Sequence, residues 1–116
     1  DKESAVFTTN GTNIVFTLNT KNDITNSETV KLNNSRSSAV QVAEHLYRKE
    51  IQSVLVEGGA EVLNHFISEG MWDEARIFTG RQLFGQGVRA PGIKGKIMMH
   101  SEFSLSTLDV LSNSVL

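Results

Sequence analysis

The segment from Ser53 to Ile67 constrains the fold of this chain more than any other. It begins with an aliphatic run, continues with Glu57-Gly58-Gly59, and then carries apolar residues at helical spacing. This pattern predicts a strand buried on both faces that turns directly into an amphipathic helix. Such a junction directs free backbone N–H groups and the positive end of a helix dipole beyond the strand end, which suits a phosphate. The two glycines let the backbone turn and come close to a ligand.

The rest of the chain predicts strands and helices in alternation. Strands are expected over residues 13–18, 28–32, 51–56, 72–79 and 103–111. One helix is expected within residues 35–49, capped by Ser37 or Ser38, and a second follows Gly59 and stops at Gly70. A glycine-rich loop, residues 80–95, precedes the last strand. The order predicts an α/β layer with parallel helix-linked strands and an antiparallel last strand. No repeat or linker divides residues 1–116, so we expect a single unit.

Composition excludes several functional classes. The 116 residues carry a net charge of −2 without a basic run, so bulk attraction to nucleic acid is not expected. No apolar stretch approaches the roughly 20 residues of a membrane helix. Cysteine is absent, which excludes disulfides and thiolate metal sites and agrees with a cytoplasmic protein. The three histidines show no metal-ligand spacing, so no metal site is predicted.

Each candidate site residue also has a purely structural interpretation. Glu57 would accept hydrogen bonds from ligand hydroxyl or ring N–H groups, or would stabilise its own turn; like charge keeps it away from a phosphate. Gly58 and Gly59 fit a ligand or a plain tight turn, because neither G-x-G-x-x-G nor a Walker A motif is present. Thr17 would contact a ligand, or is simply a good strand residue. Glu61 favours the helix dipole but would oppose an anion.

Several motifs resemble a known family. Val54-Leu-Val-Glu-Gly-Gly-Ala60, the helix end Phe66-Ile-Ser-Glu-Gly70 and Trp72-Asp-Glu-Ala75 closely resemble the C-terminal part of the reductase domain of bacterial riboflavin-biosynthesis deaminase-reductases. The family's L-[IF]-G-G loop corresponds to Leu83-Phe-Gly-Gln-Gly87, where Gln86 separates the glycines. The resemblance implies a dihydrofolate-reductase-like fold, with a mainly parallel sheet, helices on its faces and an antiparallel C-terminal strand. This chain would be its incomplete, C-terminal half.

The resemblance also implies a reaction and its site. The family uses NADPH to reduce the ribosyl group of 5-amino-6-(phosphoribosylamino)uracil to the ribityl product. Glu57 would contact the substrate, and Thr17 would lie near the adenosine side of NADPH. Backbone N–H groups would line the cofactor's phosphates at Gly58, Gly59, Ala60, Glu61, Val62, Leu63 and Asn64. Lys21 and Arg36 are candidates for the basic group that selects NADPH over NADH.

The family's reductase domain is much longer than this chain, and its substrate-anchoring residues precede the matched part. We therefore identify no catalytic residue here and expect the chain alone to be inactive. The chain has no cysteine and therefore lacks the P-C-x-x-C motif of the deaminase domain. Exposed sheet edges would favour a homodimer. Two alternatives stay open: another dihydrofolate-reductase-like reductase, and a non-catalytic ligand-binding or oligomerisation module.

Overall fold

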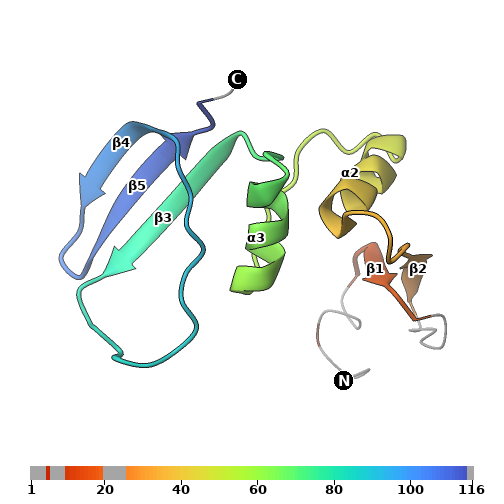
Figure 1. The fold of residues 1–116 in the computed structure, drawn as a ribbon, viewed down its shortest axis with the longest axis horizontal. Helices are drawn as coiled ribbons and strands as arrows, with labels where there is room; N and C mark the ends of the chain where they lie inside the picture. Colours follow the sequence, from red (N-terminus) through yellow and green to blue (C-terminus); the bar gives the residue numbers. More distant parts are fainter. Residues whose placement is uncertain (1–4, 6–9, 20–25, 115–116) are drawn as a thin grey trace. The chain divides into compact units, whose positions relative to one another are not determined.

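The computed structural model describes residue 5, residues 10–19 and residues 26–114, and the chain divides into two compact units, residues 1–52 and 53–116 (Figure 1). The first unit contains strands β1 (Asn13–Thr17) and β2 (Ser27–Lys31) and helix α2 (Ser38–Arg48). The two strands pair in parallel, with Thr17 opposite Lys31 at their carboxyl ends. That the chain forms a single unit stays a prediction.

Helix α2 begins and packs as its sequence predicts. Ser37 is the N-cap, and its hydroxyl accepts a hydrogen bond from the backbone N–H of Val40 at 3.4 Å. Ala39 is fully buried, which accounts for a small residue on the inner face of the helix. At the other end of the helix, the Lys49 ammonium lies 2.5 Å from the Glu28 carboxylate on β2. This ion pair lowers the pKa of Glu28 and links the helix to the sheet.

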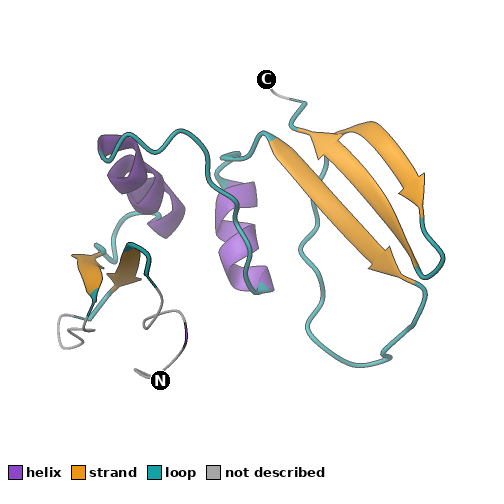
Figure 2. Ribbon diagram, turned by 180° about the vertical axis from the view of Figure 1, so that it is seen from behind, coloured by secondary structure: helices purple, strands orange, loops and turns teal. Residues whose placement is uncertain are grey.

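The second unit contains α3 (Ala60–Ser68), β3 (Glu74–Gly80), β4 (Lys96–Glu102) and β5 (Ser106–Ser112). Its three strands form one antiparallel sheet in the order β3-β5-β4 (Figure 2). The central strand supplies the buried apolar residues Val110 and Leu111. Asn113, also buried, donates its side-chain amide to the carbonyls of Gly70 and Trp72, 3.2 and 2.9 Å away. These bonds link the end of β5 to the turn between α3 and β3.

The structure confirms the α/β class and most of the expected elements. The strands expected at 13–18, 28–32 and 72–79 correspond to β1, β2 and β3, and both helices are present. Helix α3 stops at Gly70, whose φ of +65° is a left-handed conformation that glycine adopts without strain. The last strand, β5, pairs antiparallel as expected, and parallel pairing is seen between β1 and β2.

The prediction of a strand over residues 51–56 is wrong. This segment is irregular, and the side chains of Val54 and Leu55 are 53% and 82% exposed. A strand exists only when its backbone hydrogen-bonds to a neighbouring strand, and no described strand pairs with these residues. The aliphatic run therefore indicated a tendency to be buried, but it did not supply a partner.

The structure also differs from the prediction at β4, because no strand was predicted for residues 96–102. The pairing of β4 with β5 contains an irregularity between Ile97 and Met99, so the apolar alternation is interrupted at Met98. The expected strand at 103–111 is correspondingly shifted, and β5 begins only at Ser106. The bulge removed the period-2 signal by which strands are recognised.

Candidate cofactor site

Helix α3 opens without a side-chain cap. Its N-cap is Gly59, which has no side chain to accept a hydrogen bond, and the first bond of the helix runs from Leu63 N–H to Gly59 C=O at 3.2 Å. The N–H groups of Ala60, Glu61 and Val62 precede that bond and point along the helix axis away from its body. A group with negative charge is favoured at such a helix start.

The two glycines before α3 differ in their physical role. A Cβ on Gly58 would lie 3.3 Å from the Cβ of Val62, so this glycine lets the turn pack against the helix. A Cβ on Gly59 would meet nothing within 4 Å, and its φ of −67° and ψ of 167° suit any residue. Neither packing nor backbone conformation therefore requires glycine at position 59. A close approach by a ligand would require it.

The acidic side chains around this turn are exposed. Glu57 precedes Gly58, and Glu61 lies in the first turn of α3. Both residues are exposed, so neither carboxylate belongs to the buried core. An anionic group at the helix start would have to reach the backbone N–H groups of Ala60 and Val62 while avoiding the Glu61 carboxylate.

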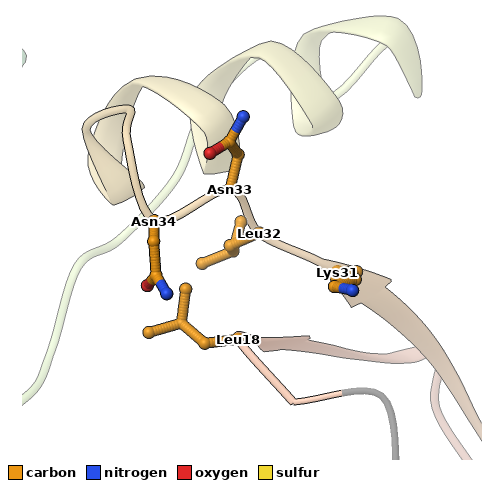
Figure 3. Close-up of a pocket in the computed structure, with 5 residues that line it drawn as sticks. All are labelled: Leu18, Lys31, Leu32, Asn33 and Asn34. Atoms are coloured by element: carbon orange, nitrogen blue, oxygen red, sulfur yellow. The ribbon is translucent and has the colours of Figure 1, made fainter.

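A second feature, in the first unit, is an open hollow of about 460 Å³. It lies at the carboxyl ends of the parallel strands β1 and β2, the edge at which α/β sheets bind their ligands. In Figure 3 the side chains of Leu18, Leu32 and Asn34 point toward one another, whereas the side chain of Asn33 points away from them. Lys31, at the end of β2, completes the lining and gives this apolar and amide surface a positive charge.

Thr17 is the last residue of β1 and lies next to this hollow in the chain. Its carbonyl accepts a hydrogen bond from Leu32 N–H at 2.8 Å, which closes the end of the strand pair. The Thr17 hydroxyl accepts a bond from Asn19 N–H and donates one to the Asn19 carbonyl, at 3.1 and 3.2 Å. A ligand at Thr17 would therefore share the hydroxyl with the turn that follows.

The sequence suggested two basic residues, Lys21 and Arg36, for the choice of NADPH over NADH. Lys21 lies outside the described residues. Arg36 is half exposed and is paired with the Glu44 carboxylate at 2.8 Å, so its charge is already partly neutralised. Lys31 is not among the residues predicted from the sequence. It lies near the end of the predicted strand 28–32 and is the last residue of β2, the strand end at which a ligand-binding side chain is expected.

The predicted site residues therefore form two groups. Residues 57–64 lie together at the start of α3, and Thr17 lies at the end of β1 beside the hollow. Among residue 5, residues 10–19 and residues 26–114, no set of three or more acidic, histidine or cysteine side chains is arranged to hold a metal ion. Within the same residues, no helix has the length and apolarity to span a membrane.

Comparison with known proteins decides the family. The sequence model of the RibD C-terminal domain matches residues 1–113, nearly the whole chain. The chain belongs to the RibD C-terminal domain family. No curated protein sequence matches it. Among solved structures it is similar to a diaminohydroxyphosphoribosylaminopyrimidine deaminase/5-amino-6-(5-phosphoribosylamino)uracil reductase from Thermotoga maritima, with 25% identity and a TM-score of 0.79. That match covers 93% of this chain and 32% of the Thermotoga protein, so this RibD C-terminal domain spans about a third of its relative.

Proposed function

We propose that this chain is the cofactor-binding part of an NADPH-dependent pyrimidine reductase of riboflavin biosynthesis, acting in the cytoplasm. NADPH, when bound, supplies the hydride that converts the ribosyl group of 5-amino-6-(5-phosphoribosylamino)uracil to a ribityl chain. Membership of the RibD C-terminal domain family and the reductase activity in the name of the Thermotoga relative support this reaction. Because the chain corresponds to about a third of that relative, we expect no turnover from it alone.

The start of α3 is the observation that carries the proposal. Gly59 has open space around it and no conformational need to be glycine. The uncapped N–H groups of Ala60, Glu61 and Val62 follow directly. A pyrophosphate fits both facts, because its oxygens accept hydrogen bonds from backbone N–H groups and its size requires a residue without a side chain. Residues 58–64 then hold the cofactor through the backbone of this turn.

The remaining residues orient the two ends of the ligands. Glu57, exposed beside the turn, accepts hydrogen bonds from the substrate. Thr17 and the hollow at the ends of β1 and β2 take the adenosine end of the cofactor, with Leu18 and Leu32 against the adenine ring. Lys31 faces the 2′-phosphate that distinguishes NADPH from NADH.

Calorimetric titration of the complete protein with NADPH tests the proposal. Gly59→Leu is expected to fold normally, because a side chain there meets nothing within 4 Å, and to weaken NADPH binding at least tenfold by occupying the pyrophosphate position. Gly92→Leu is the matched control, because a Cβ at Gly92 also meets nothing within 4 Å and this loop glycine has no role in the proposed site.

Two results would contradict the proposal. One is the absence of NADPH binding to the complete wild-type protein under conditions in which it is folded. The other is equal affinity of wild type and Gly59→Leu, which would leave the junction as a turn and favour a non-catalytic module.

A further inference from the structure

The connection between β2 and α2, residues 32–37, is held by one side chain. The Gln41 carbonyl oxygen Oε1 accepts a hydrogen bond from Asn33 N–H at 2.8 Å, and its Nε2 donates to the Asn33 carbonyl at 2.9 Å. The same Nε2 lies 3.1 Å from the Arg36 carbonyl and 3.3 Å from that of Ser37. Gln41 thus binds both backbone groups of Asn33 and also reaches the end of the connection.

A second set of bonds acts within the connection itself. The Asn33 side-chain oxygen Oδ1 accepts hydrogen bonds from the backbone N–H and the hydroxyl of Ser35, at 2.9 and 2.7 Å. This turn keeps the Asn33 side chain away from Leu18, while the Asn34 side chain points toward Leu18 (Figure 3). Gln41 and Asn33 thus bond to the part of the connection from which the Asn34 side chain points toward Leu18.

Satisfying buried polar groups does not explain these bonds. Residues 33–36 are all exposed, so water could satisfy their backbone groups at little cost. Water cannot, however, hold this six-residue connection in one conformation. A connection that is already ordered binds its ligand more tightly, because less conformational entropy is lost on binding.

We propose that Gln41 is a positioning residue for the hollow, which orders residues 33 and 34 before the adenosine end of the dinucleotide binds. Gln41 does not line the hollow, so it acts through the backbone of Asn33 rather than by contact with the ligand. The inference rests on the proposed function, since it assigns the hollow to the cofactor.

The test uses the complete protein and two halves of the cofactor, adenosine 2′,5′-bisphosphate and nicotinamide mononucleotide. Gln41→Met keeps the length of the side chain and removes its hydrogen bonds. It is expected to weaken binding of the bisphosphate about three- to tenfold and to leave the mononucleotide affinity unchanged. Amide hydrogen exchange of residues 32–37 in the ligand-free protein is expected to become faster.

Two further variants sharpen the test. Gln52→Met is the matched control, because Gln52 is exposed and outside both groups of proposed site residues. Asn33→Ala removes the bonds to Ser35, and it is expected to weaken bisphosphate binding in the same direction. If Gln41→Met fails to fold, bisphosphate binding to Asn33→Ala is measured in its place.

The outcomes separate the two proposals. Faster exchange with unchanged bisphosphate affinity, or equal loss of affinity for both halves, would overturn the role of Gln41 and leave the proposed function standing. Bisphosphate binding that does not protect residues 31–34 in the wild type would overturn the hollow as its site. Absence of any NADPH binding to the folded wild type would overturn the proposed function, and the role of Gln41 with it.

Discussion

At the scale of single residues, Gly95 is required by close packing rather than by its backbone conformation. A Cβ at this position would lie 2.5 Å from the Ser112 carbonyl oxygen and 2.8 Å from the Trp72 ring. We predict that Gly95→Ala lowers the free energy of unfolding by about 1–3 kcal/mol, because backbone at the end of β5 must move. The measurement is the urea denaturation midpoint of Gly95→Ala. The control is Gly92→Ala, because a Cβ at Gly92 would meet nothing within 4 Å. Equal midpoints for the two would contradict the predicted clash.

Lys31 provides a second prediction at this scale, on cofactor choice. It is the positive charge lining the hollow, whereas Arg36 is already paired with Glu44. Lys31→Met is expected to weaken NADPH binding about three- to tenfold and NADH binding little, because only NADPH carries the 2′-phosphate. Paired titrations measure this ratio, with Lys94→Met as an exposed control. Equal losses for both coenzymes would remove Lys31 from the choice between them.

At the scale of elements, strands β4 and β5 are joined by a charged cross-strand pair. His100 and Asp109 are directly opposite each other, with Nδ1 and Oδ1 2.5 Å apart. The hydrogen bond to Asp109 and the charge of that carboxylate raise the pKa of His100. A raised pKa in the folded state means that protonated His100 stabilises the pairing.

The predicted pH dependence follows from that direction. The stabilisation is fully present below the unfolded-state pKa of about 6.5, and it is lost as the pH rises through the higher folded-state pKa. Thermal unfolding of wild type and His100→Gln across this window is expected to show the two converging with increasing pH. A difference in melting temperature that stays constant across the window would contradict a role for the charge.

At the scale of the whole molecule, the described residues bury few side chains. Only Ala39, Val110 and Leu111 are buried apolar residues among them, while many large apolar side chains are exposed. The most exposed of these are Tyr47, Leu55, Leu83, Phe84, Val88 and Leu105. Exposed apolar surface and unpaired sheet edges favour association. We predict that the 116-residue chain forms dimers or larger species, which light scattering at micromolar concentration would detect. A monomeric mass would count against this.

Local sequence was enough to predict the helices and their ends. Ser37 caps α2, and Gly70 ends α3 in a left-handed conformation. Both follow from hydrogen bonds and steric limits that span a few residues. The Glu57-Gly58-Gly59 junction was likewise visible in the sequence, and so was the family, because the motif is contiguous. The roles of the residues in that motif stay predictions.

Tertiary structure decided what depends on residues far apart in the chain. The segment 51–56 has a strand-like sequence but pairs with no strand among the described residues, and β4 pairs through a bulge that interrupts its alternation. The hollow exists because parallel pairing brings Leu18 beside Leu32 and Asn34. Backbone hydrogen bonds between strands carry no local sequence signal, so sequence alone determined the helices, the glycine turn and the family, while pairing determined the sheets and the hollow.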